Sequence, residues 1–471
     1  MSSQLRAVVP ATVDEDGLAA ALRANLHGEV IDRAHPEYDR ARQVWNGLID
    51  RYPAVIARCT GAADVVAAVG AAREFHPPVS IRGGGHQIAG SAVCDNGLVI
   101  DLSPMKGVAV DPIGHTLRAG GGVTWGELDR EAQLFGLATT GGEVSTTGIA
   151  GFTLGGGMGL LMRAYGLACD NLRSAEIVTA DGMVRTASRQ EHQDLFWALR
   201  GGGRGLGVVT GLEYDLHPLG PQVATAQVFY PYEAAAQLLR GWSDVVRALP
   251  ETITPQLALW SVPPDPALPA ELHWQRAVMV AGISAGPAES GAATLAPLRE
   301  LAEPLLDLSG LTSYLEIQSA VDPLFPAGGR YYMKSHFMAD LPEPAIEAML
   351  AQDARRPTPE SLIVIRSMGG AVARVGADET AFPHRSEPFN VSIDAGWVDP
   401  ALDATAVGWA RDTWRALVQY ASGGVYVNFS GFGEEADELR DAVFGGNQRR
   451  LAEVRAAYDP AGLFDAASRR P

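Results

Sequence analysis

Four short glycine-rich segments carry the clearest chemical signal in the sequence. They are residues 82–86 (RGGGH), 120–122 (GGG), 141–159 (GGEVSTTGIAGFTLGGGMG) and 201–203 (GGG). Because glycine has no side chain, its backbone N–H groups can approach an anion closely, and it adopts positive φ without steric cost. Several such turns at strand ends could together surround a diphosphate, although any one of them could be only a turn.

Simpler phosphate and metal motifs are absent from the sequence. No G-x-G-x-x-G follows a predicted strand and opens a helix with an acidic residue about 20 positions later, as an NAD-binding fingerprint requires, and no Walker A lysine occurs. We therefore expect loops to hold the diphosphate. No H-E-x-x-H occurs, and Cys59, Cys94 and Cys169 form no C-x-x-C pair, so no metal site is predicted.

The composition is that of an acidic globular protein. Lys and Arg number 37 against 55 Asp and Glu, a formal net charge of −18, and 47% of the residues are hydrophobic. This charge argues against a nucleic-acid partner and against a polybasic membrane surface. The first residues lack a basic segment followed by an apolar run, and no stretch reaches the length of a membrane span. We expect a cytoplasmic protein without a membrane partner.

The elements that must position the glycines alternate over short distances. Residues 59–78 have the period of a helix that ends at two prolines, and residues 176–188 place an Asp-Gly pair between two β-prone runs, the signature of a hairpin. Beyond residue 220 longer strands are predicted at 273–283, 331–338, 361–368 and 389–397, with helices at 342–352 and 402–420. These segments predict one antiparallel sheet covered by helices, and an α+β fold class overall.

Three blocks follow from this pattern. Residues 1–217 are predicted to form a ligand-binding domain, and residues 218–422 a domain built on the antiparallel sheet. Residues 423–471 return to short motifs like those of the first block.

Candidate acid–base groups lie on the predicted strands of the sheet. Because side chains alternate along a strand, Asn390, Ser392 and Asp394 share one face, which is unusual on a buried strand unless it lines a cavity. On the strand at 331–338 either face could line a pocket: Tyr332, Lys334 and His336, or Tyr331, Met333, Ser335 and Phe337. Glu316 and Arg366 are further polar candidates, although such residues are more often members of a structural ion pair than ligand contacts.

Several motifs in combination resemble one flavoprotein family. Residues 79–103, 141–182, 194–210 and the tail VYVNF…YDPAGLF are similar to the berberine-bridge-enzyme-like branch of the vanillyl-alcohol-oxidase superfamily, which has a PCMH-type FAD-binding domain. The likeness runs through roughly residues 45–217 and 425–466. It implies a two-part FAD-binding domain around a central substrate domain, with FAD as the cofactor. Between these regions the likeness is looser, chiefly in GGAVARVGADETAFPHR and the tryptophan of DAGW.

The resemblance also implies how the cofactor is attached. In the family the histidine that ends RGGGH is joined covalently to the flavin 8α-methyl group, and here this residue is His86; the alternative is a histidine that only contacts a phosphate. Many relatives make a second bond through a cysteine, but Val144 stands at that position. A single covalent link through His86 is therefore implied, and an oligosaccharide substrate is disfavoured.

Other flavin contacts are carried over position by position. Thr147 falls beside the flavin, where it would influence oxygen access, or it could serve only loop packing. Tyr165, Gly166, Asp170 and Asn171 match the stretch that lines the ribityl chain and ring. The full set implied to bind FAD is Arg82, Gly83, Gly84, Gly85, His86, Gln87, Gly142, Val144, Thr146, Thr147, Gly148, Gly151, Gly156, Tyr165, Gly166, Asp170, Asn171, Val208, Val209, Tyr426 and Asn428.

Asp394 and Tyr426 are the catalytic candidates. Asp394 matches a position where the family carries a catalytic or substrate-contacting Glu or Gln, although it could be a structural hydrogen-bond acceptor. Tyr426 and Asn428 match the family's Tyr-x-Asn, and period-two spacing on a strand would place them on one face. A phenol is a poor base at neutral pH unless a neighbouring cation lowers its pKa. Phe429 stands where many relatives have a second tyrosine.

The resemblance supports three functional hypotheses. The first is an FAD-dependent oxidase that removes a hydride from an alcohol, an amine or an activated C–H of a small molecule such as a secondary metabolite. Molecular oxygen would reoxidise the flavin and give hydrogen peroxide. The second is a dehydrogenase that uses another electron acceptor, and the third is a flavin-binding protein without turnover.

Overall fold

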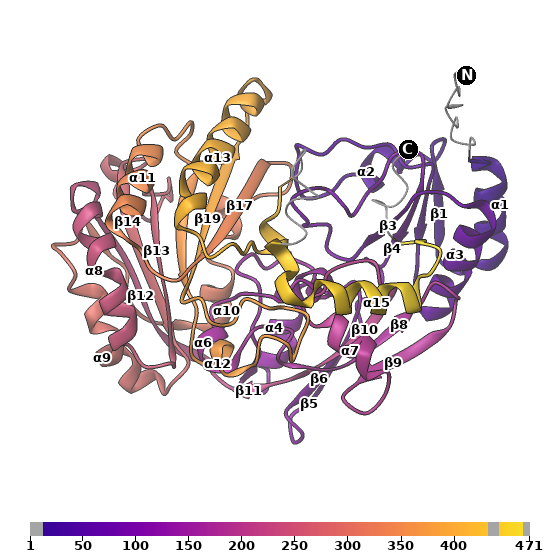
Figure 1. Cartoon of the computed structure of the whole chain (residues 1–471), viewed down its shortest axis with the longest axis horizontal. Helices are drawn as coiled ribbons and strands as arrows, with labels where there is room; N and C mark the ends of the chain where they lie inside the picture. The colour runs from indigo at the N-terminus through magenta and orange to yellow at the C-terminus, as the bar shows by residue number, and fades with distance from the viewer. Residues whose placement is uncertain (1–12, 432–441, 465–471) are drawn as a thin grey trace, which may run out of the picture.

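A region of short strands and helices lies beside one large antiparallel sheet (Figure 1). The structure is a computed structural model that describes residues 13–431 and 442–464. Within these ranges no helix is both long enough and apolar enough to cross a membrane. The mixture of helices and antiparallel strands confirms the α+β fold class.

The first sheet presents the segment RGGGH at the end of one of its strands. Its order is β1 (Glu29–Asp32), β2 (Val55–Arg58), β4 (Leu98–Asp101) and β3 (Val79–Arg82), with β2 and β3 both parallel to β4. The helices α1 (Glu15–Asn25) and α3 (Ala62–Phe75) pack on it, and α2 (Tyr38–Ala41) follows β1. Helix α3 ends at Phe75, with His76 as its C-cap before the two prolines, as predicted. Because β3 ends at Arg82, the glycines continue from a buried strand.

A second sheet carries the other glycine turns. Its order is β5 (Val108–Asp111), β6 (Thr116–Gly120), β10 (Val208–Asp215), β8 (Leu172–Val178) and β9 (Val184–Ser188). The predicted hairpin between β8 and β9 is confirmed. Around this sheet lie α4 (Trp125–Gln133), α5 (Ile149–Leu154), α6 (Met162–Tyr165), α7 (Gln193–Leu199), the pair β7 (Leu137–Ala138) and β11 (His217–Pro218), and α15 (Gln448–Tyr458).

The end of the described chain packs back against this second sheet region. Leu451 and Val454 of α15 belong to the same buried cluster as Leu195 and Leu199 of α7. The Arg455 guanidinium donates to the Gly202 carbonyl at 2.6 Å. Residues separated by about half of the sequence therefore complete one core, and α15 runs along that region in Figure 1.

The large sheet has the order β15-β12-β14-β13-β18-β19-β17, and β16 also pairs with β12. Its strands are β12 (Gln222–Pro231), β13 (Ile253–Ser261), β14 (Arg276–Ser284), β15 (Leu306–Asp307), β16 (Gly310–Ser313), β17 (Arg330–Met338), β18 (Leu362–Ser367) and β19 (Phe389–Trp397). The four strands predicted for this sheet are therefore confirmed as members of it. The helices that cover its outer face are α8 (Ala235–Ala248), α9 (Ala288–Arg299), α11 (Glu343–Asp353) and α13 (Asp403–Leu417) (Figure 1).

Short helices make up most of the remaining connections. They are α10 (Tyr314–Gln318), α12 (Ala371–Arg374) and the 3-10 helices η1 (Tyr232–Ala234), η2 (Ala270–Leu272), η3 (Asp322–Leu324), η4 (Pro400–Leu402), η5 (Val418–Tyr420), η6 (Val427–Phe429) and η7 (Gly445–Asn447). The strand expected around Tyr426 and Asn428 is wrong, because residues 427–429 form η6. The two side chains still meet, through a hydrogen bond of 2.8 Å.

The large sheet has an apolar outer face and a partly polar inner face. On β19, Val391 and Ile393 pack in the helix-covered core, so Asp394 points to the inner face, as predicted. Lys334 and His336 of β17 lie against the Trp414 ring of α13, on the outer side. The inner face of β17 is therefore the one that carries Tyr331, Met333, Ser335 and Phe337.

Candidate functional site

His86 is held by contacts on its ring face and on both ring nitrogens. Its half-buried ring stacks on the Trp45 ring, with centroids 4.7 Å apart. Nε2 lies 2.8 Å from the Thr146 hydroxyl and Nδ1 lies 3.4 Å from the Thr147 hydroxyl. Desolvation lowers the pKa of His86 to about 4. The imidazole is therefore neutral at physiological pH and keeps a nucleophilic lone pair in a fixed orientation.

Trp45 connects His86 to the inner face of the large sheet. The Trp45 ring also stacks on Tyr331 of β17, with centroids 4.0 Å apart and planes at 8°. The Trp45 indole N–H donates to the Phe325 carbonyl at 3.0 Å. His86 therefore lies at the junction between the glycine turns and the inner face of the sheet.

The glycine turns meet beside His86 as bare backbone. A Cβ on Gly84 would lie 2.3 Å from the Gly148 nitrogen, and one on Gly83 would lie 2.9 Å from the Gly121 carbonyl oxygen. These glycines are thus required because three loops cross at van der Waals distance, besides any contact with an anion. At Gly151, by contrast, a Cβ would meet nothing within 4 Å. A side-chain-free surface next to a neutral histidine fits the diphosphate and ring edge of FAD.

Several residues predicted to contact the flavin have their polar groups engaged within the protein. Arg82 donates to Asp101 at 2.7 Å and to the Ala41 carbonyl at 2.6 Å. Asp170 accepts two hydrogen bonds from Arg385, at 2.7 and 2.8 Å. Asn171 donates to the Tyr165 and Leu167 carbonyls, at 3.0 and 2.8 Å. These three side chains shape the loops, and their direct contact with flavin stays a prediction.

The other predicted flavin residues lie on the glycine turns, at the end of α6 or on β10. Tyr165 stacks on His217 at 4.0 Å, and Gln87 accepts from the Ser91 N–H at 3.3 Å. Gly85, Gly156 and Gly166 have positive φ values of 73°, 107° and 82°. Gly142 and Val144 precede Thr146 in its loop, and Val208 and Val209 are buried in β10.

An acidic and basic cluster lies on the inner face of the large sheet, in contact with the loop that carries Thr146. Arg366 of β18 donates to Glu143 at 3.2 Å and to the Ser392 hydroxyl at 2.7 Å, and its guanidinium lies 4.0 Å from Asp394. Glu143 was not recognised from the sequence, although it is the only charged residue of the segment 141–159. Glu316, in contrast, caps α10 through Ser313 and is exposed.

Asp394 is the buried carboxyl group of this cluster. Ser392 donates to its Oδ2 at 3.1 Å, whereas its Oδ1 has no hydrogen-bond partner among the described residues. Burial raises the pKa of Asp394 to about 6, and the Arg366 charge opposes part of that shift. A carboxylate that ionises near neutrality and keeps an unused oxygen can accept a proton from a substrate.

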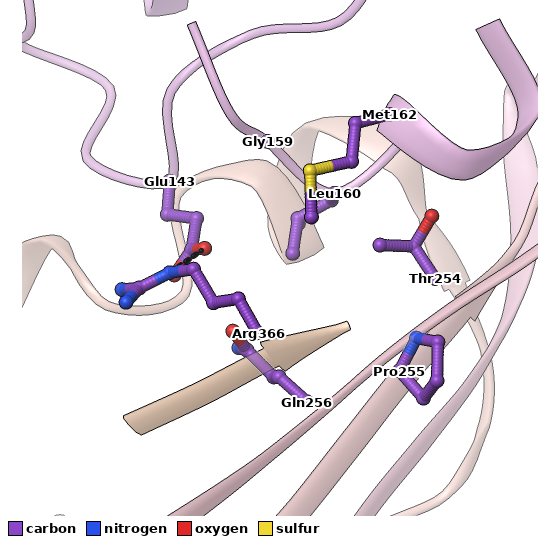
Figure 2. A pocket seen from close by; sticks show the side chains of 8 residues that line it. All are labelled: Glu143, Gly159, Leu160, Met162, Thr254, Pro255, Gln256 and Arg366. Carbon is purple, nitrogen blue, oxygen red and sulfur yellow. Dashed lines mark hydrogen bonds and ion pairs between the residues drawn. The ribbon is translucent and has the colours of Figure 1, made fainter. Parts of the chain in front are cut away.

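A small cavity adjoins the cluster, where Glu143 and Arg366 meet the loop before α6 (Figure 2). Its volume is about 10 Å³, the space of about one water molecule. The lining residues are Glu143, Gly159, Leu160, Met162, Thr254, Pro255, Gln256 and Arg366. Apolar side chains line this cavity together with the charged pair Glu143 and Arg366.

Tyr426 is surrounded by hydrogen-bond donors. Its hydroxyl oxygen accepts from the N–H groups of Gly157 and Met158, at 3.1 and 3.0 Å, and from the Asn428 amide at 2.8 Å. Asn428 also donates to the Phe152 carbonyl at 3.1 Å. Burial raises the pKa of Tyr426 to about 12. The phenol therefore keeps its proton and ties the turn after α5 to the C-terminal segment.

Tyr426→Phe is expected to lower the free energy of unfolding by about 2 kcal/mol, because buried N–H donors lose their acceptor. Denaturant unfolding would measure the change, with Tyr52→Phe at an exposed position as the control. A variant that kept its stability but lost turnover would instead assign the base role to the phenol.

Comparison with known proteins agrees with this geometry. One family model, described as an FAD binding domain, matches residues 53–188, and another, described as berberine and berberine like, matches residues 425–468. The FAD-linked oxidoreductase YgaK of Bacillus subtilis is 30% identical over 455 residues, which cover 94% of this chain and 96% of that protein. The chain belongs to the berberine-bridge-enzyme-like FAD-linked oxidoreductases.

Two further relatives of this FAD-linked oxidoreductase are named for their activity. (R)-6-hydroxynicotine oxidase of Paenarthrobacter nicotinovorans is 37% identical over 235 residues, about half of each chain. The crystal structure of 6-hydroxy-D-nicotine oxidase from Arthrobacter nicotinovorans superposes with a TM-score of 0.82 at 29% identity, covering 93% of this chain and 96% of that one. The berberine-bridge-enzyme-like protein 1 of Physcomitrella patens shares the fold, with a TM-score of 0.85 at 22% identity.

Proposed function

We propose that this FAD-linked oxidoreductase is an oxidase of small molecules that bears one covalent FAD, attached through His86. One observation carries the proposal: the loop at 143–147 places Thr146 and Thr147 on His86 and Glu143 on Arg366, next to Asp394. The five residues of this loop thus connect His86, the attachment point, with the Asp394 carboxyl group, which would accept the proton. Bound FAD would accept a hydride from the substrate carbon and pass its electrons to molecular oxygen, with hydrogen peroxide as the product.

The residues of the chain supply the remaining functions. Asp394 takes the proton of the substrate hydroxyl or amine, because its pKa of about 6 leaves it ionised at neutral pH while Tyr426 keeps its own proton. Arg366 lies between the carboxylates of Glu143 and Asp394 and orients both of them. Thr147 presents a small side chain beside His86, which leaves space for oxygen. The substrate is an alcohol, an amine or an activated C–H compound of small size.

Reoxidation by air distinguishes an oxidase from a dehydrogenase. A panel of alcohols, amines and activated C–H compounds is mixed with the protein without oxygen, and loss of the yellow absorbance identifies a substrate. We expect the colour to return on admitting air, with one hydrogen peroxide formed for each substrate oxidised. Colour that returned only with an electron-accepting dye would indicate a dehydrogenase. A flavin that no compound bleached would contradict turnover altogether.

A further inference from the structure

The loop at 142–147 is held from outside by residues of the large-sheet region. Gln318 of α10 donates to the Gly142 carbonyl at 2.8 Å, and Arg366 donates to Glu143 at 3.2 Å. The strongest contact is at Ser145, whose N–H donates to Asp322 Oδ1 at 2.7 Å and whose hydroxyl donates to Asp322 Oδ2.

Asp322 uses its carboxylate in an unusual way for a residue at the start of a short 3-10 helix. Acidic residues in turns commonly accept hydrogen bonds from their own neighbours, as Asp399 does from Ala401. Both oxygens of Asp322 instead accept from Ser145, a residue 177 positions away. A carboxylate that accepts two hydrogen bonds from one residue fixes that residue in position and orientation.

Ser145 directly precedes the two threonines that touch His86. On the other side of the loop, the backbone is bound to α4: the Gly126 N–H donates to the Ser145 carbonyl at 2.8 Å and the Trp125 N–H donates to the Thr147 carbonyl at 3.0 Å. These backbone hydrogen bonds fix the distance between residues 145–147 and the start of α4. The Asp322 bonds add the restraint from the large-sheet side.

We infer that Asp322 is a positioning residue for the cofactor-attachment site: by holding Ser145 it keeps Thr146 and Thr147 against the two nitrogens of His86. The inference rests on the proposed function, because it concerns the reaction of His86 with FAD. It assigns a role to a residue of the η3 segment, which has no direct contact with His86.

The experiment follows the attachment of FAD to apoprotein in wild type, Asp322→Ala, Ser145→Ala and Asp307→Asn. Ser145→Ala removes only the hydroxyl bond, so it provides a milder variant. Asp307→Asn removes an ion pair with Arg299 in the same region without touching the loop, and serves as the matched control. Attachment is measured as flavin retained in acid-precipitated protein against time. Hydrogen exchange of the amides of residues 143–147 is measured on the same samples.

We expect Asp322→Ala to slow attachment by about tenfold to 100-fold, since a misplacement of about 1 Å can cost about 10²-fold in rate. Hydrogen exchange at 143–147 should become faster, and Ser145→Ala should have a smaller effect. A protein that carries both Asp322→Ala and Ser145→Ala should attach FAD no more slowly than Asp322→Ala alone. Attachment at the wild-type rate in Asp322→Ala, or equal slowing in Asp307→Asn, would overturn the inference.

The two proposals fail in different ways. If the wild-type protein releases its FAD in acid, the covalent attachment is wrong. The role of Asp322 is then judged by the dissociation constant for FAD. A dissociation constant about tenfold larger in Asp322→Ala, together with faster hydrogen exchange of residues 143–147, supports the role. An unchanged dissociation constant overturns it. If Asp322→Ala does not fold, Ser145→Ala decides by the same measurements.

Discussion

His86→Ala is expected to release all of its FAD on acid precipitation, whereas the wild-type pellet stays yellow. The variant keeps the bare backbone formed by the turns at 83–84, 121 and 148, so it should still bind FAD reversibly. It lacks the neutral imidazole that Thr146 and Thr147 hold at 2.8 and 3.4 Å. Absorbance of pellet and supernatant, and flavin fluorescence of a denaturing gel, measure the outcome.

The matched control for this experiment is His115→Ala. His115 is exposed in the turn between β5 and β6, so its removal should leave the pellet yellow. A yellow pellet from His86→Ala would place the attachment on another side chain. A wild-type protein with no pigment, even after incubation with FAD, would contradict the cofactor assignment for this chain.

Asp394→Asn is expected to lower kcat by roughly 10²- to 10⁴-fold, the usual contribution of a positioned general base. The amide keeps the shape of the side chain but cannot take a proton. In the wild type, activity should rise with pH through about 6, because the carboxyl group must lose its own proton before it can accept one. The variant should lack this rise.

The contribution of Asp394 to stability should fall with rising pH, whereas the activity should rise. Because burial raises the folded-state pKa of Asp394 from 3.8 to about 6, the folded protein binds this proton more tightly than the unfolded chain does. The contribution of Asp394 to the free energy of unfolding therefore decreases as the pH rises from about 4 to about 6. Glu316→Gln, at an exposed capping position, should leave the pH profile of activity unchanged. An Asp394→Asn protein that retained a tenth or more of its activity and the acid-side rise would assign the base to another group.

Local patterns predicted the elements that carry this site. The alternation on β19 placed Asp394 on the inner face because a strand that is covered by helices must turn its apolar residues toward them. The Asp181-Gly182 pair predicted a hairpin because Gly182 must adopt a positive φ there, and its value is 81°. Both signals depend on neighbouring residues alone.

Contacts between distant residues were beyond the reach of the sequence. Glu143 and Arg366 are 223 positions apart, and nothing in either segment indicates the other. The glycine pattern at 83–84 and 148 indicated close approach, but the same pattern serves an anion or another backbone. Tyr426 and Asn428 were assigned to a strand because their spacing of two matches the period of a strand. Tertiary hydrogen bonds to residues 152–158 favour a 3-10 turn instead.

The packing of α15 against α7 has a consequence for how the protein is made in the cell. The core around Leu195 also needs Leu451 and Val454, which leave the ribosome some 250 residues later. At a synthesis rate of about 5–20 residues per second, the nascent chain must wait on the order of ten seconds or longer for these side chains. This core is therefore completed only after α15 has been synthesised, and a stop codon before α15 would leave the side of α7 that it covers exposed to water.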